Sequence, residues 1–287
     1  MPRAERGAIR ALQRYAFGGR SVAVFEYGLD PACRYGWGSP PHLGLLEILA
    51  AGERVYAATI ESLLTYEGEL SSIPNGRQVA PGSLSWDNDY WGGLDAVVLY
   101  ASLCARRPRT YLEIGSGFST MFARRAIESH GLATRVVSID PSPRTDIDGL
   151  CDEIIRRPLA EADTAMFGRL EPGDMVVLDG THNVFMNSDT VVAFLEVLPA
   201  IPPGVLVAVD DIFLPWDYPP TWTGRWYAEQ YLLATMLLAG TPGWSVRFPA
   251  WYVTNESALV ERLDPLWRHV LTPVGKVAKS FWMERQP

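Results

Sequence analysis

The sequence predicts an α/β fold in which helices flank one doubly wound, seven-stranded sheet, with a helical cap before it. Beyond about residue 82, short runs rich in Val, Ile and Leu alternate with helical patterns. This alternation is typical of a parallel sheet with crossover helices. Residues 1–81 lack it and indicate helices and loops. We therefore expect an N-terminal helical cap and linker at residues 1–81, and the sheet domain at residues 82–287.

The cap is predicted from one helical stretch at about residues 43–66. Apolar side chains recur there at near-helical spacing. A Gly-Trp-Gly-Ser-Pro-Pro turn at residues 36–41 precedes it. The apolar positions are Leu46, Ile48, Leu49, Val55, Ile60, Leu63 and Leu64.

Seven segments of the sheet domain have strand patterns. Between the first two, residues 118–129 form an expected helix, with Ser119 near its start and Gly131 just past its end. A second, mostly buried helix is expected at residues 226–238; a dimer surface, and so a homo-oligomer, stays open there. The strands are expected at residues 110–114, 135–140, 153–157, 175–179 and 205–210, with weaker patterns at 245–253 and 279–284.

Composition excludes several classes of partner. The net charge of −8 provides no positive field for a phosphate backbone, so nucleic acid is not expected. No apolar run approaches the roughly 20 residues of a membrane-spanning helix, so no membrane is expected either. Cys33, Cys104 and Cys151 are far apart in the sequence, which favours neither disulfides nor zinc and fits a reducing cytoplasm.

A glycine turn ends the first expected strand, in the run Glu113-Ile-Gly115-Ser116-Gly117. Glycine allows a sharp turn and the close approach of a ligand, and the helix that follows favours a negative group at its N-terminus. By itself the pattern is explained equally well by a plain tight turn.

An acid at the end of the second expected strand makes a ligand the better explanation. Asp140 lies about 25 residues past the glycines, where a carboxylate can accept both hydroxyls of a ribose. Ser142 follows at the same edge. The combination points to a nucleoside ligand. The third glycine of an NAD fingerprint would fall at Thr120, so an NAD-dependent oxidoreductase is the weaker alternative.

Three acids follow the fourth and fifth expected strands. Asp179 ends one strand, and Asp210 with Asp211 ends the next. Neighbouring strands open onto the same crevice, so these carboxylates should converge. Their repulsion must be offset by a cation, by protonation or by hydrogen bonds. An oxygen-rich set without thiolate suits Mg²⁺; a helix cap or a contact with the cofactor's amino group is the alternative.

From about residue 86 to 284 the chain resembles the class I S-adenosylmethionine-dependent methyltransferases, on the strength of the glycine turn and Asp140. The resemblance implies a Rossmann-like sheet domain that binds S-adenosylmethionine and carries the catalysis. A non-catalytic subunit with this fold is a further alternative. The implied cofactor-binding residues are Glu113, Gly115, Ser116, Gly117, Asp140, Ser142 and Asp179.

A narrower resemblance rests on Asp179-x-x-His182 and the Asp210-Asp211 pair. It is to the metal-dependent small-molecule O-methyltransferases, such as catechol O-methyltransferase and enzymes that methylate macrolide sugars. It implies that Asp179, Asp210 and Asp211 hold Mg²⁺ or a similar cation, with His182 as general base. The acceptor would be a hydroxyl of a small molecule, such as a sugar or glycosylated metabolite. A structural role for His182 stays open.

An aromatic loop follows the acidic pair. Aromatic faces pack well against sugars and planar rings, so the loop is expected to form a wall of the acceptor site or a lid. Anchoring of the loop onto the cap explains its composition equally well. The candidate substrate residues are Trp216, Tyr218, Trp222 and Trp226.

Overall fold

The structure is a computed structural model that describes residues 26–76, 84–88, 90–240, 242–269 and 278–287. The chain divides into two compact units, residues 1–32 and 33–287. Of the first unit only residues 26–32 are described, and they form no helix or strand. The cap boundary expected at residues 81 and 82 lies outside the described residues. All that follows concerns the second unit.

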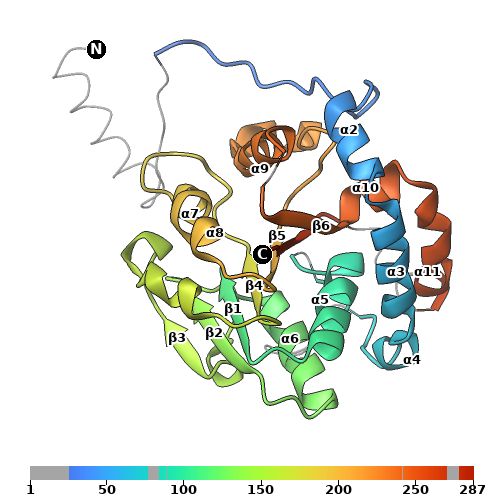
Figure 1. Ribbon diagram of the computed structural model, residues 1–287, viewed down its shortest axis with the longest axis vertical. Coiled ribbons are helices and arrows are strands. Elements are labelled where there is room, and N and C mark those ends of the chain that lie inside the picture. Colours follow the sequence, from blue (N-terminus) through green and yellow to red (C-terminus); the bar gives the residue numbers. More distant parts are fainter. Residues whose placement is uncertain (1–25, 77–83, 89, 241, 270–277) are drawn as a thin grey trace. The chain divides into compact units, whose positions relative to one another are not determined.

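The second unit is built on one seven-stranded sheet with the order β3-β2-β1-β4-β5-β7-β6 (Figure 1). Strands β1 to β5 run parallel, and β7 runs antiparallel between β5 and β6. The predicted fold class is confirmed. The strands are β1 (Thr110–Ile114), β2 (Arg135–Ile139), β3 (Glu153–Ile155), β4 (Met175–Leu178), β5 (Leu206–Val209), β6 (Trp244–Pro249) and β7 (Phe281–Arg285).

The central strands are apolar along their whole length because helices cover both faces of the sheet. Every residue of β4 and β5 is buried. The register pairs Ile114 of β1 with Leu178 of β4, and Leu178 with Val209 of β5. The three strands therefore end at one level, and the residues after each strand meet at one edge.

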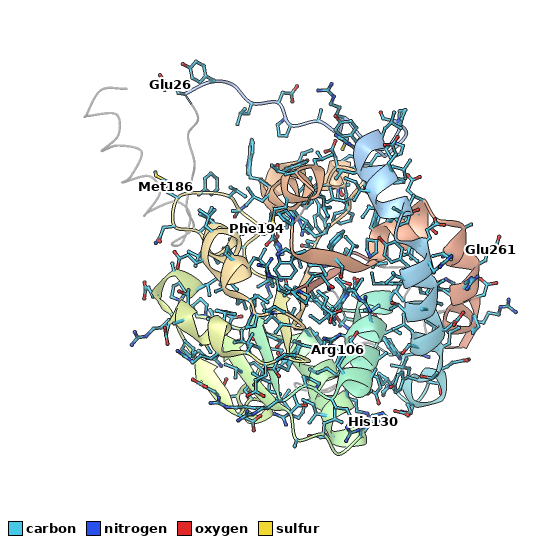
Figure 2. All side chains as sticks on the ribbon, viewed as in Figure 1. Glu26, Arg106, His130, Met186, Phe194 and Glu261 are labelled. Carbon is cyan, nitrogen blue, oxygen red and sulfur yellow. The ribbon has the colours of Figure 1, made fainter. Side chains whose placement is uncertain are left out.

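Helices of the expected cap region pack against the helices that flank the sheet (Figure 1): α3 contacts α5, and α2 contacts α9. Helix α5 packs on α6, and α3 packs on α5 and β6. Helix α6 has the predicted bounds and ends before His130 (Figure 2), whose Nε2 lies 2.6 Å from Glu69 Oε2 of α4. The helices are α2 (Leu43–Ala50), α3 (Glu53–Leu64), α4 (Glu67–Leu70), α5 (Gly93–Arg106), α6 (Phe118–Ser129), α7 (Asp189–Val192), α8 (Leu198–Ala200), α9 (Glu229–Leu238), α10 (Ala250–Asn255) and α11 (Asp264–His269).

Three predicted elements differ from the structure. The stretch at residues 43–66 is two helices, α2 and α3, which separate at Ala51 and Gly52. The strand expected at residues 245–253 ends at Pro249, because proline has no N–H for the ladder, and α10 follows. The helix expected at residues 226–238 begins at Glu229 and leaves Tyr231 and Leu238 half exposed, so it is less buried than predicted.

The described residues also bear on the expectations about membrane-spanning helices and cysteines. No helix among the described residues is long and apolar enough to cross a membrane. Cys33, Cys104 and Cys151 are all free thiols.

A buried carboxylate connects α5 to the chain that enters β7. Asp95 Oδ1 accepts hydrogen bonds from the backbone N of Ser280, at 2.8 Å, and from its Oγ, at 2.6 Å. The backbone N of Lys279 donates to both oxygens of Asp95, at 3.0 Å each. Burial raises the pKa of Asp95, and Lys279 and Ser280 oppose that rise. Asp95 thus fixes the position of Lys279.

We expect Asp95→Ala to destabilise the protein by about 3 kcal/mol, because it leaves three buried donors of Lys279 and Ser280 without their acceptor. Urea denaturation followed by circular dichroism measures the change. Glu128→Ala, which removes an exposed carboxylate from α6, is the matched control. Equal effects of the two substitutions would contradict the role given to Asp95.

Candidate active site

The glycine turn after β1 requires glycine at one position and leaves space at the other. Gly115 has a φ of +78°, and a Cβ there would overlap the carbonyl oxygen of Asp179. Gly117 has an extended φ of 174°, which any residue can adopt. A Cβ on Gly117 would meet no atom within 4 Å. The open side of Gly117 is therefore available to a ligand that lies against the backbone.

Glu113 supports this turn from inside the sheet. Its side chain is fully buried, and the hydroxyl groups of Tyr111 and Thr120 donate to its two carboxylate oxygens. Thr120 Oγ1 also accepts from the backbone N of Gly117, at 3.1 Å. Burial raises the pKa of Glu113 to about 7, although these hydrogen bonds oppose the rise. Glu113 and Thr120 therefore act on a ligand through the shape of the turn.

Asp140 joins the turn to the loop after β2. Its Oδ2 accepts from the backbone N of Ser116, at 2.8 Å, and its Oδ1 accepts from the backbone N of Ser142, at 2.7 Å. The Ser116 hydroxyl lies 2.8 Å from the Ser138 hydroxyl and points into the sheet. Each carboxylate oxygen of Asp140 keeps a second lone pair that can accept from a ribose hydroxyl. With the open side of Gly117, these residues fit a nucleoside such as that of S-adenosylmethionine.

His182, on the loop after β4, is surrounded by carboxylates. Its Nδ1 lies 2.8 Å from Glu229 Oε2. Its Nε2 lies 3.4 Å from both Asp179 Oδ1 and Asp211 Oδ2. Burial lowers the pKa of His182, but hydrogen bonds to Asp179 and Glu229 and the Asp211 charge bring it well above its ordinary value. Both ring nitrogens of His182 therefore face carboxylates, which orient the ring and favour its protonated form.

Two residues of the site have left-handed backbone conformations. The φ angle is 58° at His182 and 55° at Asp211. Such conformations cost about 1–3 kcal/mol each away from glycine and are concentrated at functional sites. The carbonyl of His182 accepts from the backbone N–H groups of Ala228 and Glu229, at 2.9 and 3.3 Å. These two bonds attach the His182 loop to the start of α9.

Glu229 is the partner of His182 that the sequence analysis missed. It is the first residue of α9 and is buried. Burial raises the pKa of Glu229, and His182 opposes the rise. Glu229 is also the only charged residue of α9, among otherwise mostly apolar residues. A lone acid in such a helix was the available signal, because a buried charge requires a partner.

Lys279, also missed, forms ion pairs with the acidic pair after β5. Its Nζ lies 2.8 Å from Asp210 Oδ2 and 2.5 Å from Asp211 Oδ1. Burial would raise the pKa of Asp211, but Lys279 and His182 hold it below its ordinary value. Burial raises the pKa of Asp210 well above its ordinary value, and Lys279 only partly opposes this. The signal in the sequence was a lysine at the start of an apolar strand.

The acidic cluster as it stands does not fit the expected Mg²⁺. Lys279 binds one carboxylate oxygen each of Asp210 and Asp211, so a divalent cation would have to displace the ammonium group or lie beside it. No group of three or more His, Cys, Asp or Glu side chains within the described ranges is placed to hold a metal ion. The convergence of Asp179, Asp210 and Asp211 was anticipated, but the cation that offsets them is a side chain.

Aromatic rings continue outward from His182. The ring of Tyr227, which was not among the predicted residues, lies 4.7 Å from that of His182. Trp222 packs edge-on against Tyr227 at 5.8 Å, and the Arg225 guanidinium lies 3.8 Å over the Trp222 ring. Tyr218 is buried, and its hydroxyl accepts from the backbone N of Gln230, at 3.1 Å. Tyr227 therefore contacts His182, and Trp222 and Tyr218 pack around Tyr227.

The other predicted aromatic residues have different surroundings. Trp216 Nε1 donates to Glu256, and its ring packs against Trp251, with centroids 5.4 Å apart. These contacts attach the aromatic loop to neighbouring segments. Trp226 is 41% exposed, and its carbonyl accepts from Asn183 Nδ2 at 3.0 Å. The substrate roles of these residues remain predictions.

Comparison with known proteins identifies the central segment. Residues 112–212 match a family model described as a methyltransferase domain. This segment contains the glycine turn, Asp140, His182 and the acidic pair. The predicted resemblance to the class I methyltransferases and the predicted enzyme class, an S-adenosylmethionine-dependent methyltransferase, are confirmed. A search of curated proteins gave no match.

Several solved structures are similar to the chain at low identity. The O-methyltransferase TomG from Streptomyces achromogenes, solved with S-adenosylmethionine, is 18% identical over 68% of this chain and 80% of its own, with a TM-score of 0.40. An O-methyltransferase from Bacillus cereus, solved with S-adenosylhomocysteine, is 17% identical over 80% and 91%, also with a TM-score of 0.40. MycE, from the mycinamycin biosynthetic pathway, is 18% identical over 64% and 47%, with a TM-score of 0.35. At these values none of them identifies an acceptor or a metal for this chain.

The two glycines of the turn should respond differently to alanine. We expect Gly115→Ala to lower the melting temperature, because the new Cβ overlaps the Asp179 carbonyl. Gly117→Ala should leave the melting temperature unchanged but weaken S-adenosylmethionine binding about tenfold or more, because its Cβ enters the space next to the backbone. Thermal unfolding and titration calorimetry measure the two effects. Unchanged affinity in Gly117→Ala would place the cofactor elsewhere.

Proposed function

We propose that the protein transfers the methyl group of S-adenosylmethionine to a hydroxyl oxygen of a small molecule. The match of residues 112–212 to a methyltransferase domain supports this proposal. The observation that carries the proposal is the buried pair of His182 and Glu229, with its 2.8 Å contact. This pair lies at the same sheet edge as the glycine turn and Asp140. A base beside a cofactor site is what transfer to a hydroxyl requires.

The side chains divide the chemistry as follows. S-adenosylmethionine supplies a sulfonium methyl group that is already a strong electrophile. His182 Nε2 accepts the proton of the acceptor hydroxyl as its oxygen forms the new bond to the methyl carbon; the bond between sulfur and that carbon breaks, and its electron pair stays on the sulfur of S-adenosylhomocysteine. Glu229 accepts the Nδ1–H of His182, which fixes the tautomer with its lone pair on Nε2. Asp140 and the turn hold the cofactor in line. The transfer as proposed needs no metal ion, and Lys279 forms ion pairs with Asp210 and Asp211.

The surroundings of His182 support a ring-bearing acceptor. The Tyr227 ring lies next to His182 and Trp222 packs on Tyr227, and such aromatic surfaces pack well against sugars and planar rings. A sugar or glycosylated secondary metabolite is the acceptor class that we propose. The Arg225 guanidinium is exposed above Trp222 and adds a hydrogen-bond donor for oxygen atoms at the rim.

Release of S-adenosylhomocysteine in the presence of glycosides and phenols tests this function. We expect His182→Asn to reduce turnover about 10²- to 10⁴-fold, because general-base catalysis is lost. Its affinity for S-adenosylmethionine, measured by calorimetry, should stay within about twofold. His42→Asn is the matched control. Absence of S-adenosylmethionine binding to the wild-type protein would contradict the proposed function. Near-normal turnover of His182→Asn would show that His182 is not the general base.

The titration of His182 can be measured without an acceptor. The folded pKa is raised, so the imidazole should stay protonated to higher pH than an ordinary histidine, and the free base should form only as the pH rises through that pKa. Glu229→Gln removes a stabilising charge and should lower the pKa of His182. Nitrogen-15 NMR can resolve the imidazole signals because the chain has only four histidines.

Glu69→Gln is the control for this titration, because Glu69 contacts His130 and should leave His182 unchanged. A Glu229→Gln titration equal to that of the wild type would show that Glu229 does not act on His182. The activity profile should follow the same direction, with the rate rising toward alkaline pH and its rising limb shifting to lower pH in Glu229→Gln.

A further inference from the structure

The Lys279 ammonium group occupies the place that the narrower resemblance gives to a divalent cation. That place is defined by Asp179, Asp210 and Asp211, and Lys279 Nζ binds the last two at 2.8 and 2.5 Å. We propose that Lys279 is a built-in cation that replaces the metal at this site, and that its remaining N–H binds the acceptor oxygen. The second half of this inference rests on the proposed function; the first half does not.

The position of the ammonium group is fixed from both ends. Asp95 accepts from the backbone N of Lys279 with both oxygens, and Asp210 and Asp211 hold the side-chain end. An ammonium group has three N–H donors, so one remains after these two contacts. The Lys279 side chain is 16% exposed, against 2% for that of Asp210, so it is the more accessible partner of this ion pair. We therefore assign the remaining donor to the acceptor oxygen.

The charges around the cluster oppose a divalent cation beside Lys279. The Lys279 ammonium group forms ion pairs with both Asp210 and Asp211, at 2.8 and 2.5 Å. Arg225 adds positive charge next to Asp211. A dication would meet Lys279 and Arg225, and it could reach the bound oxygen atoms of Asp210 and Asp211 only by displacing a lysine that Asp95 fixes at its backbone.

A lysine in this place has a consequence for the acceptor. Mg²⁺ prefers six oxygen ligands and takes few from the protein, so the substrate of a magnesium site often supplies some of the ligand oxygen atoms itself. An ammonium group donates one hydrogen bond at a time and has no such geometric demand. The positive charge of Lys279 stabilises the negative charge that develops on a single oxygen as His182 removes its proton. We therefore infer an acceptor that needs only one hydroxyl, without a neighbouring second one.

Binding of Mn²⁺, followed by electron paramagnetic resonance, tests the first half on the full chain. Wild-type protein should show no specific Mn²⁺ binding up to about 1 mM, whereas Lys279→Ala should gain a site at least about tenfold tighter than that limit. The charge-conserving Lys279→Arg should resemble the wild type. Asp210→Asn added to Lys279→Ala should abolish the gained site.

Two outcomes overturn the inference. One is wild-type binding of Mn²⁺ that Asp210→Asn or Asp211→Asn abolishes, because the metal would then displace the lysine. This measurement needs no Lys279 variant, so it decides the question even if Lys279→Ala does not fold. The other is a folded Lys279→Ala, and a folded Lys279→Met, with no gain of Mn²⁺ binding.

Kinetics test the second half separately. Wild-type turnover should be unchanged by EDTA and should be retained with acceptors that carry one isolated hydroxyl. Lys279→Met should raise KM for the acceptor and lower kcat, with S-adenosylmethionine affinity unchanged. Dependence of turnover on added Mg²⁺, or on a vicinal diol, would overturn this half. Failure of the proposed function gives a different result: no S-adenosylmethionine binding or no transfer, whatever the Mn²⁺ measurement shows.

Discussion

The compensation of buried charge at the ends of β4 and β5 is the constraint on which the rest of the site depends. Asp210 and Asp211 are almost inaccessible to water, and such groups are tolerated only when they are paired, hydrogen-bonded or neutralised. Lys279 provides positive charge, and His182 adds to it in its protonated form. Removal of either cation would leave carboxylates repelling one another, so the positions of β7 and of the His182 loop are coupled to the charge of the site.

The sheet order explains why these groups can meet. β7 lies directly beside β5 and runs antiparallel to it, so the residues that enter β7 lie beside the residues that leave β5. Lys279 therefore faces Asp210 and Asp211 at the carboxyl edge. β4, the other neighbour of β5, delivers Asp179 and His182 to the same edge. The left-handed conformations of His182 and Asp211 direct their side chains toward each other, and the ion contacts offset the conformational cost.

Local pattern was enough to predict most of the fold and part of the site. The bounds of β1 and α6 follow from residues within the segments themselves, and so do the glycine turn and Asp140. The misplaced elements are those in which a single backbone residue overrode the pattern, as Pro249 did in ending β6. The sequence pattern did not predict which side chains distant in the sequence form ion pairs. Glu229 lies 47 residues from His182, and Lys279 lies 69 residues from Asp210.

The expectation of a metal depends on the same missing information about pairing. Like charges at Asp179, Asp210 and Asp211 do require a compensating cation, and composition alone does not show whether a metal or a distant lysine supplies it. A metal ion and a lysine side chain reach the site in different ways. A metal must be recruited from solution, whereas Lys279 is positioned during folding by its backbone contact with Asp95. The site is then charged and oriented before any ligand arrives, which is the condition under which a fixed dipole or charge stabilises a transition state most effectively. Asp95 of α5 thereby acts on the chemistry of the site through Lys279, without contact between Asp95 and the reacting groups.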